Sequence, residues 1–209
     1  MDLHEILKTS YADRDKQKNA LSKYGYKYDS ILSNSDNAVF YNPNERKLLH
    51  TIAGTKRLSD VGVDAYLAVG KLKDTNRYKD SHRILREAKK KYGVDNATVA
   101  GTSLGGAIAG YVSSGNDKVY TLNKGATIGQ KVRSNEQAYR TSGDIISLAN
   151  ANSKHMKTLN NENGNLMNNI KKSVAIGTAT HPLVGVAHGI RQALRSHSTD
   201  SIRNSNIRI

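Results

Sequence analysis

The chain has 209 residues, of which 37% are hydrophobic, and it contains no cysteine and no tryptophan. This length allows one domain with a sizeable core, and the lack of cysteine excludes a disulfide framework and any cysteine-ligated metal site. Lysine and arginine (32) outnumber the acidic residues (18), for a formal net charge of +14. Such an excess favours a polyanionic neighbour, either nucleic acid or an anionic membrane surface.

The first 30 residues are polar and basic, and we treat 1–30 as a polar N-terminal segment. Leu3, Ile6 and Leu7 predict one side of a short helix within it. The start lacks the basic residues and apolar run of a secretory signal. The weakly charged stretch 173–190 is broken by histidine, proline and glycine, so no transmembrane segment is expected and a cytoplasmic location follows.

A β-hairpin and two helices are predicted next. The β-prone runs 38–41 and 47–53 flank Asn42-Pro43-Asn44-Glu45, whose residue types are typical of turns. One helix is expected to begin at Ser59 and Asp60. The second covers 79–92, where apolar and basic residues fall on different faces and Gly93 ends the helix.

A strand–turn–helix–strand unit follows. Residues 97–100 predict a buried strand, 107–113 a helix of small residues and 118–122 the next strand, with shorter strands expected at 144–148 and 156–159. This order indicates an α/β fold with a mostly parallel sheet and helices on both faces. We therefore expect one small domain over 31–200 and a basic C-terminal tail over 201–209.

The turn of this unit, Gly101-Thr102-Ser103-Leu104-Gly105, has the G-x-S-x-G pattern of a nucleophile elbow. In such an elbow a strand turns sharply into a helix with serine at the apex, and flanking glycines avoid clashes with neighbouring backbone. The N–H of Leu104 and the helix dipole would then favour negative charge beside Ser103. The alternatives are a glycine-rich helix start without chemistry and a phosphate-binding turn, although the lysine and serine or threonine of a P-loop are missing.

With these residues the chain resembles the class 3 (fungal-type) lipase family of α/β-hydrolase-like enzymes. The segment 102–107 is similar to that family's His-Ser-Leu-Gly-Gly-Ala, with Thr102 in place of histidine. The segment 52–55 resembles its Arg-Gly-Thr/Ser segment, with Ala53 in place of arginine, and 142–146 resembles the segment that supplies the acid. Similar proteins occur in large DNA viruses, so the resemblance adds a virion-associated location to the cytoplasmic one.

The resemblance implies a Ser–Asp–His triad and acyl transfer through an acyl-serine. Ser103 is the nucleophile, Asp144 the acid in preference to Asp117, and Thr55 and Leu104 the oxyanion donors. His197, in Ser-His-Ser-Thr-Asp, is the favoured base and His181 the alternative. His155 follows Asp144 closely and His188 falls within an expected helix, so both are less suitable.

The resemblance implies carboxylic esters of lipids as substrates and no cofactor, and the sequence has no metal-binding pattern. A second hypothesis is a non-enzymatic structural protein, such as a minor virion component, built on a hydrolase-like scaffold. A third is nucleic-acid binding through the basic charge, although no recognised binding module is present.

Overall fold

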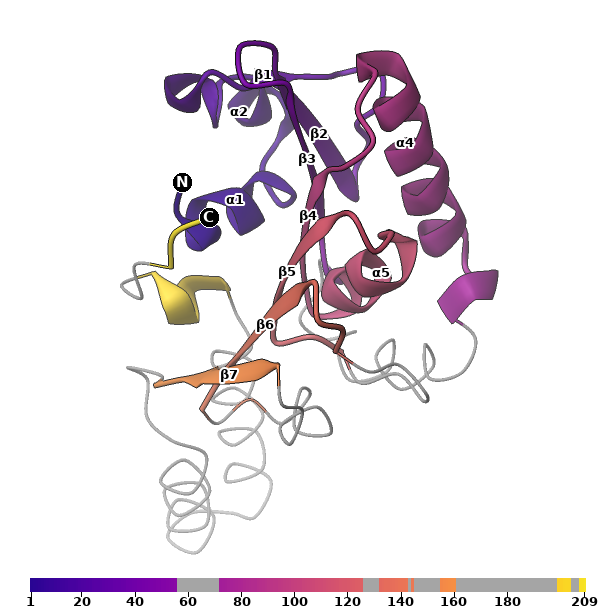
Figure 1. Ribbon diagram of the computed structural model, residues 1–209. Helices are drawn as coiled ribbons and strands as arrows, with labels where there is room; N and C mark the ends of the chain where they lie inside the picture. The colour runs from indigo at the N-terminus through magenta and orange to yellow at the C-terminus, as the bar shows by residue number, and fades with distance from the viewer. Residues whose placement is uncertain (56–71, 126–131, 143, 145–154, 161–198, 204–206) are drawn as a thin grey trace, which may run out of the picture.

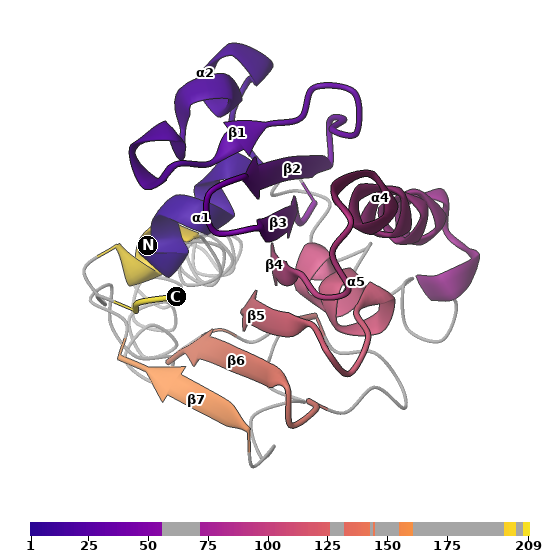
Figure 2. The same cartoon turned by 45° about the horizontal axis from the view of Figure 1, so that its top comes forward.

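The computed structural model describes residues 1–55, 72–125, 132–142, 144, 155–160, 199–203 and 207–209. Their centre is a seven-stranded sheet whose strands follow one another in chain order from β1 to β7 (Figures 1 and 2). The strands are β1 (Lys27–Tyr28), β2 (Asn37–Asn42), β3 (Lys47–Ile52), β4 (Thr98–Thr102), β5 (Lys118–Leu122), β6 (Glu136–Thr141) and β7 (Met156–Leu159). The helical elements are α1 (Leu3–Thr9), α2 (Arg14–Asn19), η1 (Ser22–Tyr24), η2 (Leu72–Asp74), α4 (Asn76–Tyr92), α5 (Leu104–Val112) and η4 (Thr199–Ile202).

The predicted hairpin is present, because β2 and β3 pair antiparallel with Asn42 opposite Lys47. Its turn is held by the Asn42 side chain, whose Oδ1 accepts hydrogen bonds from the N–H groups of Asn44 (3.0 Å) and Glu45 (3.1 Å). A short asparagine side chain can mimic a backbone turn in this way. The turn chemistry of the sequence therefore fixes the register of the two strands.

The strands from β3 to β7 are all parallel, which confirms the predicted α/β fold with a mostly parallel sheet. The connections β3–α4–β4 and β4–α5–β5 both lead to the next strand in the same direction along the sheet. Because such connections have the same hand, both helices lie on one face of the sheet. Figure 1 shows α4 and α5 together on that face and α1 on the other. The helix predicted over 79–92 is α4, and Gly93 ends it at φ 59°, donating its N–H to the carbonyls of Lys89 and Lys90.

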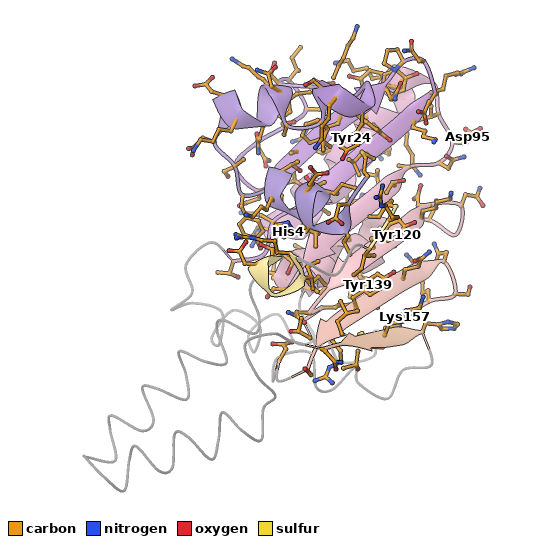
Figure 3. The ribbon with its side chains drawn as sticks, turned by 90° about the vertical axis from the view of Figure 1, so that its left-hand side faces the viewer. His4, Tyr24, Asp95, Tyr120, Tyr139 and Lys157 are labelled. Atoms are coloured by element: carbon orange, nitrogen blue, oxygen red, sulfur yellow. The ribbon has the colours of Figure 1, made fainter. Side chains whose placement is uncertain are left out.

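The core lies on both faces of the sheet because side chains alternate along each strand. Val39, Val99 and Val119 face α4 and α5, whereas their neighbours Ala100 and Tyr120 face α1. Figure 3 looks onto this second face and shows Tyr120 and Tyr139 on adjacent strands.

Segment 1–30, expected as a polar N-terminal segment, contributes α1 to this core. Leu3, Ile6 and Leu7 are completely buried against the sheet. Full burial of such a side chain stabilises a fold by roughly 1.5–3 kcal/mol. The predicted short helix is therefore present. Because its apolar side is packed on the sheet, the position of the residues that follow α1 is also restricted.

The C-terminal segment returns to α1. Leu3 donates its N–H to Ile207 at 2.9 Å, and Ile209 donates its N–H to Met1 at 2.9 Å. In η4, Asp200 receives hydrogen bonds at 3.3 Å from His4 and 3.1 Å from Lys8, and Figure 3 shows His4 beside this element. The expected tail 201–209 thus includes residues that pair with the start of the chain.

The strand β6 was not predicted, because its sequence Glu-Gln-Ala-Tyr-Arg-Thr is mostly polar. Its polar members Glu136, Arg140 and Thr141 are nevertheless buried. Asp144, expected to begin a strand, follows β6 in a non-strand conformation, and 145–148 lie outside the described residues. The helix expected from Ser59 also lies outside them. Within the described part of the chain, no helix combines the length and apolar character that a membrane span requires.

Candidate active site

Ser103 occupies the single-residue turn between β4 and α5. Its backbone has φ 55° and ψ −126°, although it is not glycine, and its exposed fraction is 4%. A side-chain-bearing residue at positive φ costs conformational energy, so the surrounding structure has to hold it there. The resulting strand–turn–helix geometry is that of a nucleophile elbow.

Neighbouring glycines allow this turn because backbone approaches them too closely for a side chain. A Cβ on Gly101 would lie 2.5 Å from the carbonyl carbon of Gly105. A Cβ on Gly105 would lie 2.5 Å from the carbonyl oxygen of Ala53. Both distances are shorter than any van der Waals contact, so the two glycines of the motif have the steric role that the sequence suggested.

Three backbone hydrogen bonds hold the elbow. Ser103 donates its N–H to Leu122 at 3.1 Å, and the Ser103 carbonyl accepts the N–H groups of Ala107 (3.1 Å) and Gly125 (3.0 Å). Leu122 ends β5 and Gly125 lies in the loop after it. The neighbouring strand therefore fixes both sides of the serine backbone.

Of the two expected oxyanion donors, Leu104 directly follows this turn and Thr55 follows a residue that packs on it. Leu104 is the first residue of α5, and the first amides of a helix have no intrahelical acceptor. Thr55 follows Gly54, where an added Cβ would be 2.8 Å from the carbonyl of Thr102 and 3.0 Å from the Cβ of Ser103. Ala53 and Gly54 therefore pack directly on the elbow, and an anion beside them would also benefit from the N-terminus of α5.

Asp144 lies just beyond β6 and is completely buried. Its N–H donates to Thr141 at 3.1 Å, and its carbonyl accepts a hydrogen bond from the Arg140 guanidinium at 3.0 Å. Since β4 and β6 run parallel to β5, Ser103 and Asp144 both follow the carboxyl ends of strands, at the same edge of the sheet. Ligand sites of open α/β sheets form at this edge.

Asn123 connects the elbow to the segment that carries the acid. It follows β5 at φ 47°, donates its N–H to Tyr139 at 2.8 Å, and accepts the Thr141 N–H at 2.8 Å through Oδ1. Thr141 in turn accepts the Asp144 N–H. The sequence analysis did not identify Asn123, and an isolated asparagine after a strand gives no signal that could have found it.

The rejected acid, Asp117, has a structural role at the start of β5. Its carboxylate accepts the N–H groups of Ala97 (2.8 Å) and Ser114 (2.7 Å) and forms an ion pair with Lys89 at 2.6 Å. Lys118, the next residue, begins β5, so Asp117 lies at the opposite edge of the sheet from Ser103. This position leaves Asp144 as the better candidate of the two.

The favoured base His197, the alternative His181, and His188 all lie outside the described residues. His155 immediately precedes β7 and therefore lies at the amino edge of the sheet, away from Ser103. The assignment of the base therefore remains a prediction from sequence.

The other described histidines have different surroundings. His50 is fully buried in β3 at 2.8 Å from the Asn37 side chain, and burial lowers its pKa to about 3. His4 contacts Asp200, and the His82 ring stacks on Tyr78 on α4.

A buried ion pair joins the loop after β5 to β6, close to Gly106 of α5. The Lys124 ammonium contacts both oxygens of Glu136, at 2.8 and 2.9 Å, and the Glu136 carboxylate also accepts the Thr121 hydroxyl at 3.0 Å. Burial lowers the pKa of Lys124, and the charge of Glu136 opposes this effect. Because Glu136 holds this ammonium, Lys124 supports the packing and is a poor candidate for a serine-activating base.

Tyr11 and Arg77 also contact the segment beside Ser103, and the sequence analysis missed both. The Tyr11 hydroxyl accepts the N–H of Gly54 at 2.7 Å. Arg77 donates to the carbonyls of Ala53 (2.5 Å) and Gly54 (3.4 Å). Both residues are distant in sequence from the motif, so only tertiary structure reveals them.

The described residues thus define an α/β fold with a serine elbow at the carboxyl edge of a mostly parallel sheet. No family model and no curated protein sequence matches the chain. Among solved structures, Lip2 lipase from Yarrowia lipolytica is 16% identical, with a TM-score of 0.43 over 69% of this chain and 72% of that lipase. The Rhizomucor miehei lipase propeptide complex is 17% identical, with a TM-score of 0.46 over 71% of this chain and 62% of that one.

Proposed function

We propose that this protein is a serine hydrolase that cleaves carboxylic esters of lipids through an acyl-serine intermediate. The observation that supports this most is Ser103 itself, held at φ 55° at the N-terminus of α5. A strained serine at a helix start, packed against a second loop, suits attack on a carbonyl and stabilisation of the oxyanion that results.

In the proposed reaction Ser103 Oγ attacks the ester carbonyl while a histidine accepts its proton. His197 is our candidate for this base and His181 the alternative, with Asp144 orienting the imidazole. The oxyanion is held by Thr55 and the N–H of Leu104. The histidine then gives the proton to the leaving alcohol, and water hydrolyses the acyl-serine by the reverse sequence of proton transfers.

The decisive experiment is labelling with a fluorophosphonate probe, followed by mass spectrometry of the modified peptide. Wild-type protein should be labelled on Ser103, and Ser103→Ala should not be labelled. Ser113→Ala is the matched control, because Ser113 directly follows the C-terminal end of the same helix. Absence of labelling in folded wild-type protein would instead favour the non-enzymatic scaffold, including the virion component considered from the sequence.

We further propose that the basic surface binds anionic lipid interfaces. The exposed residues Lys79, Arg83, Arg86 and Lys90 recur at helical spacing along one side of α4. Such a row attracts a negatively charged surface at distances up to about the Debye screening length, so the attraction weakens as salt increases. Vesicles of phosphatidylserine and phosphatidylcholine should retain the protein at low salt and release it as salt increases, whereas preference for DNA over vesicles would favour the nucleic-acid hypothesis.

A further inference from the structure

Tyr11 is fixed beside the elbow by the packing of α1. The apolar side of α1 is buried on the sheet, and Tyr11 follows this helix with its N–H donated to Lys8 at 3.1 Å. The end of α1 is also joined to β3, because the Thr9 and Thr51 hydroxyls are 2.9 Å apart. The position of Tyr11 relative to the end of β3 is therefore set before any substrate binds.

The Tyr11 hydroxyl and the Ser103 Cβ both lie close to the place that a Cβ on Gly54 would occupy. Such a Cβ would be 2.7 Å from Tyr11 Oη and 3.0 Å from Ser103 Cβ. The Gly54 N–H already donates to Tyr11 and so is not a free oxyanion donor. A phenol that accepts this hydrogen bond still has its own proton to donate.

Arg77 holds the other end of the same peptide group. The N–H of Gly54 and the carbonyl of Ala53 belong to one peptide bond, and Arg77 donates to that carbonyl at 2.5 Å. The Arg77 guanidinium is itself 3.5 Å from the Asp36 carboxylate. A cation at the carbonyl polarises the peptide, which strengthens its N–H as a donor to Tyr11 and, in turn, the Tyr11 O–H as a donor.

We propose that the Tyr11 hydroxyl is a third oxyanion donor, acting with Thr55 and Leu104 and polarised by Arg77 through the Ala53–Gly54 peptide. This inference rests on the proposed serine hydrolase function. When Ser103 attacks, the negative charge forms close to the Tyr11 hydroxyl, and a preorganised donor there stabilises the transition state without further rearrangement.

The protonation state of Tyr11 agrees with this role. Burial raises the pKa of Tyr11 to about 12, and the hydrogen bond from Gly54 and the charge of Arg77 oppose that rise only in part. Tyr11 therefore keeps its proton over the range in which a histidine base operates. It donates a hydrogen bond and takes no part in proton transfer.

The test compares rates of fluorophosphonate labelling, since the probe also develops negative charge on an oxygen when serine attacks. Tyr11→Phe keeps the ring and removes only the hydroxyl. The expected result is labelling about 100- to 1,000-fold slower, with the pH midpoint of the reaction unchanged because the base is not affected. Hydrolysis of p-nitrophenyl butyrate should show the same loss in kcat with little change in KM.

Tyr92→Phe is the matched control. The Tyr92 hydroxyl also makes a partly buried hydrogen bond, to Asp29 at 2.8 Å, but it lies at the C-terminal end of α4, away from Ser103. Tyr92→Phe should lower Tm by about as much as Tyr11→Phe does and leave the labelling rate unchanged. If Tyr11→Phe is labelled as fast as wild type, Tyr11 has only a structural role and the inference is overturned while the hydrolase function stands. If wild type itself is not labelled, the proposed function fails and the inference fails with it.

Discussion

Replacing Glu136 by glutamine should destabilise the protein strongly, because it removes the charge that balances a buried ammonium. The exposed side-chain fractions are 1% for Lys124 and 0% for Glu136, so water cannot replace the lost partner. Breaking a buried ion pair on one side typically costs about 3–5 kcal/mol, because an unpaired charge is left in the interior. We expect Glu136→Gln to lower the free energy of unfolding by an amount in this range.

The loss should depend on pH in a defined direction. Burial lowers the pKa of Lys124 below its usual 10.5, and Glu136 opposes this lowering, so removing Glu136 lowers the pKa further. Between the folded and unfolded pKa values the unfolded chain binds more protons, so stability increases as pH rises. The deficit of Glu136→Gln should therefore shrink from neutral pH toward a pH of about 10.

Urea unfolding monitored by circular dichroism, repeated at several pH values, measures both effects. Glu45→Gln is the control, because the ion pair of Glu45 with Lys47 is more than half exposed on both sides. Exposed pairs contribute at most about 1 kcal/mol. A loss for Glu136→Gln no larger than that of the control, or one independent of pH, would refute the interpretation of this pair as buried and charged.

Three further predictions follow from the site and from α1. In the folded fraction, Asp144→Asn should reduce the rate of probe labelling by about 10⁴-fold, whereas Asp117→Asn should lower Tm and leave Ser103 reactive. Gly105→Ala should abolish labelling and reduce the yield of folded protein, because its Cβ would lie 2.5 Å from the Ala53 carbonyl oxygen; normal labelling would contradict the elbow geometry. Burial raises the pKa of Asp200, but hydrogen bonds from Lys8 and His4 of α1 and from Arg203 outweigh it and lower the pKa from 3.8 to about 2. The stabilisation by Asp200 is therefore complete above pH 3.8 and is lost as pH falls to about 2. In acid titrations followed by circular dichroism, Asp200→Asn should lack this part of the transition.

Local signals account for the elements that were predicted from sequence. The hairpin was predictable because Asn42 closes the turn with its own side chain, and α4 because Gly93 ends it at positive φ. The elbow was predictable because its glycine pattern is itself the signal: Gly101 has to accommodate the backbone of Gly105 within the same turn, whereas Gly105 accommodates Ala53 at the end of β3. In the hairpin and at the end of α4 the determining contacts are made within a few residues.

The strand β6 could not be predicted, because its buried members are polar and their burial depends on partners elsewhere. Glu136 is compatible with the interior only because Lys124, from the loop after β5, reaches it. Secondary-structure prediction from the hydrophobic pattern treats a charged side chain as exposed, because burying it without a partner is unfavourable. The pattern does not show which charged residues pair in the interior. The correct strand assignment therefore required the neighbouring strand to be in place.

The sequence by itself determined the strand–elbow–helix unit and the candidate nucleophile Ser103, because a turn with a positive φ at serine and closely approaching backbone restricts the flanking positions to glycine. Only the tertiary structure brought Tyr11 and Arg77 to the two ends of the Ala53–Gly54 peptide and placed Asp144 at the same edge of the sheet as Ser103. The physical reason is that these groups meet through sheet pairing and the packing of α1. Such contacts join residues far apart in the chain and leave no periodic pattern in the sequence.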